Sequence, residues 1–134
     1  MTRKLLIEAV EKAAGECDCS FQTGFEYRIA AQLKKLPAVW MAPPVLTASR
    51  GRREGVKHYA VTLKLISSCA LNEQTAKERQ WALLEDTAAR ICLLVGENGN
   101  VRCVTGEEYS PAEFSLTASG ELSLSVNFNV QMNF

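Results

Sequence analysis

The sequence predicts an α+β fold in which helices pack on one face of a mainly antiparallel sheet of four to five strands. Two patterns carry this prediction. In the closing segment 121–134 every second residue is apolar, which is typical of a strand with one buried face; these residues are Leu122, Leu124, Val126, Phe128, Val130, Met132 and Phe134. Over 81–95, apolar residues recur every three or four positions, as in a helix that lies on a sheet. With 134 residues, the chain has the size of one domain, expected to span 1–134.

The N-terminal segment has the pattern of an amphipathic helix. Over 3–15, apolar residues share one helical face and charged residues occupy the other. Thr2 is the expected cap, and Gly15 is expected to end the helix. The segment 16–22 has no periodicity, so it is predicted to be a connection.

A second helix is predicted over 24–36, ending before Pro37. Thr23 and Glu26 have the spacing of a capping box, in which each side chain accepts a hydrogen bond from a backbone N–H. The same segment leaves an alternative open, because alternating apolar residues at its start also suit a strand: Phe25, Tyr27 and Ile29.

A long β-hairpin is expected next. Residues 38–46 are apolar but contain Pro43 and Pro44, which confine this strand to an edge or end it there. A polar loop flanked by glycines is predicted over 47–55. Residues 56–67 alternate again and form the second strand of the hairpin.

The third helix is expected to begin after Asn72 as its cap, with Glu73 at the positive end of the helix dipole. Its apolar stripe includes Trp81, and Gly96 is expected to end it.

The remaining segments are short. Residues 98–99 are a turn dipeptide, 101–105 a short strand and 107–111 a polar connection. A further strand is predicted over 114–117, and 118–120 turns the chain into the terminal strand.

Composition excludes some classes of function. Fifteen basic residues balance fifteen acidic residues, which argues against a general binder of nucleic acid or membrane surfaces. No apolar run approaches the ~20 residues of a membrane span, so the chain is expected in the cytoplasm. Its five cysteines cannot all pair with one another, and reduced thiols are the expected state.

Candidate catalytic and metal-binding residues are few. His58 is the single histidine and is interpreted as an exposed strand residue, because a metal site or a triad needs further groups beside it. Cys17 and Cys19 are too close for the usual zinc spacing and have no second pair nearby. We therefore predict no catalytic residues, no metal and no cofactor.

The local charge cluster is Arg50, Arg52 and Arg53, in the expected hairpin loop. One interpretation is a solvated tip that resists aggregation. The other is contact with an acidic neighbour or a phosphate backbone, and on it these three arginines are the candidate partner-binding residues. The polar face of the terminal strand, 123–133, has two interpretations as well: exposure to solvent, or an assembly surface whose amides bond a neighbouring subunit.

Several features together resemble one family. They are the chain length, the lack of an evident active site, the segment Pro37-Ala-Val-Trp-Met-Ala-Pro-Pro44 before the hairpin, the helix with Trp81, and the final strand introduced by Leu116-Thr-Ala-Ser-Gly-Glu-Leu122. This combination resembles the tail terminator (tail completion, minor tail) proteins of long-tailed bacteriophages and prophages. Members of that family are small α/β proteins that form a ring, usually a hexamer, at the head-proximal end of the tail tube. They are not enzymes.

The resemblance implies a structural subunit that ends tube polymerisation and helps join tail to head. Its expected partners are other copies of itself, tail-tube proteins and head–tail connector proteins, with no membrane and no specific nucleic acid. It would be cytoplasmic in the host cell, and part of the virion tail if the prophage is active. The 50–53 loop would project toward a neighbouring subunit, a tube protein or the passing genome, and the polar face of 123–133 would lie at or near a ring contact.

Two other classes of function remain open at this point. A small cytoplasmic binding or regulatory module without catalytic activity would need a concave apolar pocket with a few polar groups. An enzyme would depend on His58 or on one of the cysteines.

Overall fold

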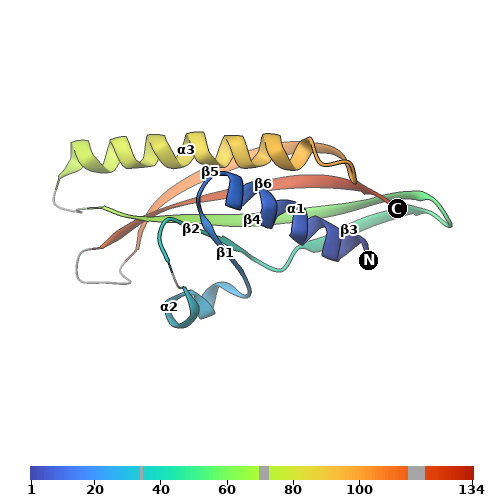
Figure 1. Ribbon diagram of the computed structural model, residues 1–134, viewed down its shortest axis with the longest axis horizontal. Coiled ribbons are helices and arrows are strands. Elements are labelled where there is room, and N and C mark those ends of the chain that lie inside the picture. Colours follow the sequence, from blue (N-terminus) through green and yellow to red (C-terminus); the bar gives the residue numbers. More distant parts are fainter. Residues whose placement is uncertain (34, 70–72, 115–119) are drawn as a thin grey trace.

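The computed structural model describes residues 1–33, 35–69, 73–114 and 120–134 (Figure 1). Its elements in chain order are α1 (Thr2–Glu16), β1 (Ser20–Thr23), the 3-10 turn η1 (Glu26–Arg28), α2 (Ile29–Gln32), β2 (Ala38–Met41), β3 (Val45–Gly51), β4 (Gly55–Ser68), α3 (Gln74–Gly96), β5 (Val101–Phe114) and β6 (Glu121–Asn133).

The six strands form one sheet in the order β1-β2-β4-β6-β5, and β3 also pairs with β4. Because β4 pairs with β6 along its length, β2 and β3 share its other edge, one after the other. All pairs are antiparallel except β1–β2. The α+β fold with a mainly antiparallel sheet is therefore confirmed, with β1 as an additional strand.

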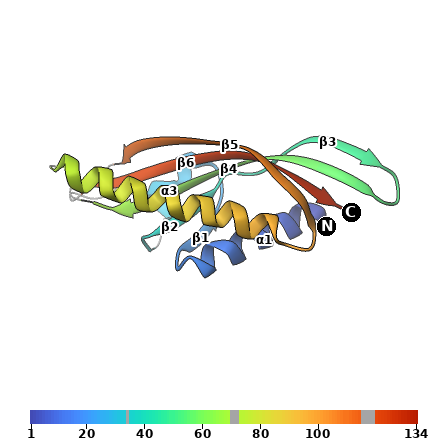
Figure 2. The ribbon, with the colours of Figure 1, turned by 90° about the horizontal axis from the view of Figure 1, so that it is seen from above.

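The core lies between the sheet and two helices, α1 and α3, which pack against each other (Figures 1 and 2). Every apolar residue of β6 from Leu122 to Met132 is buried at this interface. The predicted stripe of α3 covers them, and Trp81 donates a hydrogen bond from Nε1 to the backbone oxygen of Ser123 at 3.2 Å. The terminal strand is thus two-faced as its sequence predicts, and α3 covers its apolar side.

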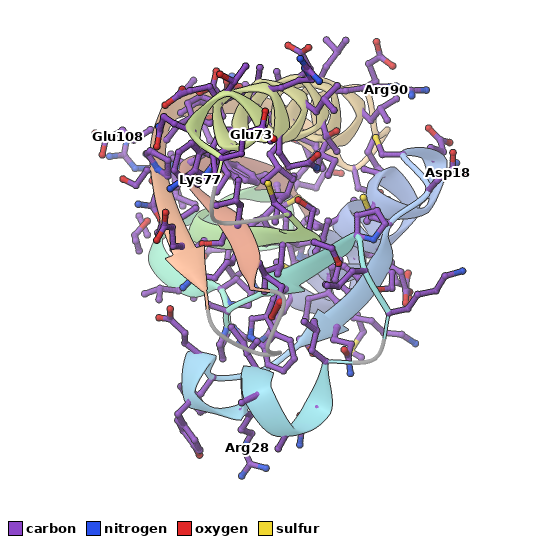
Figure 3. The ribbon with its side chains drawn as sticks, turned by 90° about the vertical axis from the view of Figure 1, so that its left-hand side faces the viewer. Asp18, Arg28, Glu73, Lys77, Arg90 and Glu108 are labelled. Atoms are coloured by element: carbon purple, nitrogen blue, oxygen red, sulfur yellow. The ribbon has the colours of Figure 1, made fainter. Side chains whose placement is uncertain are left out.

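A small second cluster lies on the opposite face, where η1 and α2 cover one corner of the sheet (Figure 3). It buries Ile29, Trp40 and Ile66, and Trp40 donates from Nε1 to the Gly24 oxygen at 2.8 Å. Gly24 has a φ of +151°, and a Cβ there would lie 3.1 Å from the Trp40 ring. The chain therefore turns tightly around this indole.

The helix predicted over 24–36 is present only in part. Among the described residues of this segment, helical structure is limited to η1 and the single turn of α2, and Thr23 ends strand β1. The expected capping box does not form, because the Glu26 carboxylate pairs with Lys64 of β4. The predicted connection 16–22 is also wrong, since it contains the start of β1.

The ends of the long helices differ in detail from the prediction. Thr2 lies inside α1 and is buried, and the capping position is Met1, which makes no side-chain cap. Gly15 does not end α1, which continues to Glu16. In α3 the capping position is Glu73, and the helix runs to Gly96; the predicted cap Asn72 is outside the described residues.

The hairpin and the fifth strand are more regular than expected. Residues 38–46 divide into β2 and β3 at the two prolines, as a missing N–H requires. The predicted loop 47–55 is mostly strand, because β3 continues to Gly51. The predicted connection 107–111 is wrong, since β5 is one strand of 14 residues that passes these positions with a register shift between Thr105 and Glu108. Of the predicted strand 114–117, only Phe114 is described, as the end of β5, and the turn at 118–119 also lies outside the described residues.

Candidate functional site

The face of the sheet that α1 and α3 leave uncovered is polar. Asn127, Asn129 and Asn133 of β6 are exposed there. Thr62 of β4 lies directly opposite Asn127 and donates from its hydroxyl to Asn127 Oδ1 at 2.8 Å. Since side chains on neighbouring strands share a face when they are paired, Glu108 and Thr105 of β5, the partners of Asn127 and Asn129, lie on the same face. The predicted polar face of 123–133 is thus exposed at Asn127, Asn129 and Asn133, whereas Ser123, the register partner of Ile66, is buried.

The arginine cluster lies at the tip of the β3–β4 hairpin, which extends past the end of α3 (Figure 1). Arg50 is the penultimate residue of β3, and Arg52 and Arg53 form the turn; all three are exposed. Gly51 has a φ of +101°, and a Cβ there would collide with the backbone of Glu54. The tight turn therefore requires this glycine.

The start of β4, directly after the hairpin turn, is anchored to the end of the chain. Gly55 and Phe134 exchange two backbone hydrogen bonds of 3.1 Å, and the ammonium group of Lys57 lies 5.3 Å from the centre of the Phe134 ring. These contacts extend the β4–β6 ladder to the start of the turn. The tip is consequently held at a defined end of the sheet.

A shallow depression lies on the uncovered face beside this tip. Arg50, His58, Gln131 and Arg102 line it, one residue from each of four neighbouring strands. His58 and Gln131 are register partners, and Arg102 lies where the register of β5 shifts between Val101 and Cys103. Arg50 and Arg102 take part in no ion pair within the described part of the chain. Guanidinium groups present several N–H donors, so this depression suits carboxylate or phosphate oxygens.

Sequence reasoning found only part of this group. It named Arg50, whereas Arg52 and Arg53 do not line the depression. It missed Arg102 and Gln131, because each is an ordinary polar residue within its own segment. Only the pairing of β5 with β6 brings them beside the hairpin. His58 was placed correctly on a strand, although it is half-buried in this depression rather than fully exposed.

A second hollow lies between α3 and β5, with a volume of about 560 Å³. Its lining is largely apolar, with the thiols of Cys92 and Cys103 and the carboxylate of Glu107. Burial raises the pKa of the Cys92 thiol to about 12, and the negative charge of Glu107 adds to this shift. A thiol with a raised pKa stays protonated at neutral pH, which makes Cys92 a poor nucleophile.

The edge of this hollow holds a phenol–carboxylate pair. Tyr109 donates from its hydroxyl to Glu107 Oε2 at 2.8 Å. Burial and this hydrogen bond to a carboxylate both raise the pKa of Tyr109, so the phenol remains a donor.

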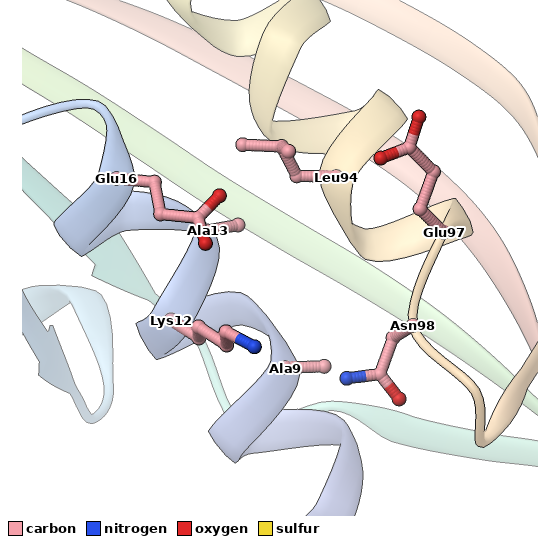
Figure 4. Close-up of a pocket in the computed structure, with 7 residues that line it drawn as sticks. All are labelled: Ala9, Lys12, Ala13, Glu16, Leu94, Glu97 and Asn98. Atoms are coloured by element: carbon pink, nitrogen blue, oxygen red, sulfur yellow. The ribbon is translucent and has the colours of Figure 1, made fainter.

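A third hollow lies between α1 and the end of α3, with a volume of about 190 Å³ (Figure 4). Lys12, Glu16, Glu97 and Asn98 surround it with polar groups. It is smaller than the 300–1,000 Å³ that is usual for small-molecule sites.

The cysteines near the N-terminus form a local contact of their own. Cys19 donates from its thiol to the backbone oxygen of Cys17 at 3.5 Å. Burial is the main cause that raises the pKa of both thiols. Cys17, Cys19, Cys92 and Cys103 are not in disulfide bonds, and no group of three or more metal-ligating side chains occurs among residues 1–33, 35–69, 73–114 and 120–134.

Comparison with known proteins leaves the family open. No family model matches the chain, and no curated protein matches its sequence. No helix in the described parts of the chain is both long enough and apolar enough to cross a membrane.

Proposed function

We propose that this protein is a structural subunit of a phage tail or tail-like assembly, in which copies form a ring that terminates the tail tube and helps join tail to head. The observation that supports this most is the shape of the sheet: one face is covered by helices, while the other presents exposed amides beside a projecting, arginine-tipped hairpin. Such a surface suits contact with other proteins.

The arginine tip has the chemistry of a partner contact. Arg52 and Arg53 are exposed at the most distant part of the hairpin and form no ion pair in the described structure. An exposed arginine can hold a carboxylate of a neighbour through two parallel hydrogen bonds. In this proposal the tip contacts a tail-tube protein or a head–tail connector protein.

The decisive experiment combines this chain with the tail-tube protein encoded in the same genome. Electron microscopy should show rings at one end of the tubes, and sedimentation should show binding of this chain to the tubes. The variant Arg52→Glu/Arg53→Glu should bind the tubes or the connector more weakly. Arg79→Glu, which changes an exposed arginine of α3, is the matched control and should bind normally. A chain that stays monomeric and unbound when tube protein is present would refute the proposal.

A second candidate is a small cytoplasmic binding or regulatory module without catalytic activity. The hollow between α3 and β5 favours it, because its volume and apolar lining fall within the usual range for small ligands. An apolar fluorescent probe should then bind the chain, and Leu93→Arg should abolish that binding. Equal probe fluorescence with both proteins would count against this function.

A further inference from the structure

Two strands leave an open edge at opposite sides of the sheet. In the described structure β5 pairs only with β6, and β3 pairs only with β4. Each edge therefore presents a row of backbone N–H and C=O groups without a partner strand. Long open edges of this kind pair readily with another chain.

The two edges carry opposite charge. Arg50 lies on β3, with Arg52 and Arg53 at the adjoining turn, whereas Glu107 and Glu108 lie in the middle of β5. All five residues are exposed, and none of them forms an ion pair in the parts of the chain that are described. The net charge of the chain is zero, so these patches attract each other between copies without an overall repulsion.

The strand directions are compatible with this contact. From β3 through β4 and β6 to β5, each strand is antiparallel to the next. A second copy that lies beside the first with its strands in the same directions places its β3 antiparallel to β5. The alternation of directions then continues from copy to copy.

One register also matches the faces of the two strands. Arg50 pairs with Val56, whose partner on β6 is Asn133, and Glu108 pairs with Asn127, so both charged residues lie on the uncovered face. Cross-strand partners must share a face, and Arg50 opposite Glu108 satisfies this condition.

The same register brings apolar residues together. Carried past the register shift that β3 shows between Leu46 and Ala48, it places Leu46 opposite Pro111, and both lie on the face that the helices cover, because their present partners are Tyr59 and Leu124. Leu46 is 49% exposed in the single chain, so a neighbour would bury apolar surface here. Pro111 has no N–H, which removes one backbone hydrogen bond from the contact.

We infer that β3 of one copy pairs with β5 of a second copy, with Arg50 of the first against Glu108 of the second. This contact uses different surfaces on the two copies, so it repeats, and it closes into a ring when the rotation axis is inclined to the strands, because Arg50 is level with Asn133 and Glu108 with Asn127. The inference rests on the proposed function, in that it names the contact between copies that a ring requires.

Charge exchange tests this contact. Arg50→Glu alone and Glu108→Arg alone each place like charges opposite one another, and each should weaken self-association about tenfold. An equimolar mixture of the two variants should associate again, because each contact in a mixed ring joins opposite charges. Native mass spectrometry and sedimentation velocity, at protein concentrations up to about 1 mM, measure the species formed. Far-UV circular dichroism checks that the variants fold.

The controls separate this inference from the proposed function. Arg79→Glu changes an exposed charge on α3 and should leave self-association unchanged. Wild-type association that neither single variant weakens would overturn the β3–β5 contact and leave the ring proposal standing. A wild-type chain that is monomeric at every concentration would also overturn the contact between copies. The proposed function would then depend on the experiment with tail-tube protein alone.

Discussion

The substitution Leu124→Ala tests the feature on which the whole architecture depends, the burial of one face of β6 under α3. Leu124 has no exposed surface and lies between Leu65 of β4 and Pro111 of β5. It belongs to the main core cluster together with residues of α1 and α3. The substitution changes only side-chain volume, since alanine can also occupy a strand.

The expected loss of stability follows from what is removed. Three buried carbon atoms contribute roughly 2.4 kcal/mol of transfer free energy, at about 0.8 kcal/mol each. The cavity that remains adds to this, so the free energy of unfolding should fall by about 3–4 kcal/mol, within the range of buried leucine truncations. For a chain of this size, the midpoint of thermal unfolding should fall by about 10–15 °C.

Urea unfolding followed by circular dichroism at 25 °C measures this loss. The matched control is Asn129→Ala, because Asn129 lies on the same strand but is exposed on the opposite face. Its expected cost is below about 0.5 kcal/mol. A loss below about 1 kcal/mol for Leu124→Ala, or equal losses for both variants, would refute the two-faced strand.

Three further predictions concern single contacts. Burial raises the pKa of Cys92 from 9.0 to about 12, so the contribution of its protonated thiol to the free energy of unfolding is complete below pH 9 and is lost as the pH rises to about 12. The free energy of urea unfolding of Cys92→Ala should therefore depend less on pH in this range than that of the wild type. Parallel plots of this free energy against pH for the two proteins would contradict the prediction. Trp40→Phe removes the hydrogen bond to the Gly24 oxygen and should lower the free energy of unfolding, measured by thermal unfolding, by about 1–2 kcal/mol. An unchanged midpoint of thermal unfolding would show that this hydrogen bond contributes nothing to stability. Lys77→Ala removes a 2.9 Å ion pair with the half-exposed Glu113, and a loss above about 1 kcal/mol in urea unfolding would contradict its description as a surface pair.

The elements that sequence predicted well are those whose pattern is local. On β6 and α3, period-two and period-3.6 patterns follow from burial of one face, and the sequence contains them directly. The prolines at 43–44 likewise divide the strands, because the missing N–H is a property of the residue itself.

The elements that it missed depend on partners far away in the chain. β1 is a strand because its four residues pair with β2. Glu26 does not form the predicted capping box, because its carboxylate pairs with Lys64 of β4. β5 continues through Glu107 and Glu108 because β6 supplies a ladder of hydrogen bonds, even though the register shift interrupts the alternation. Because the residues at 107–111 are polar and exposed, their sequence pattern did not indicate that they belong to β5.

The candidate site divides in the same way. The three neighbouring arginines were visible in the sequence because they are adjacent in the chain, and the hairpin places them at its tip. Arg102 and Gln131 join Arg50 only through strand pairing, which composition does not reveal. The sequence by itself determined which faces of β6 and α3 are apolar, because that depends on the spacing of residues. Only the tertiary structure decided which sheet edges stay open and which charges lie on them, because strand order depends on contacts along the whole chain.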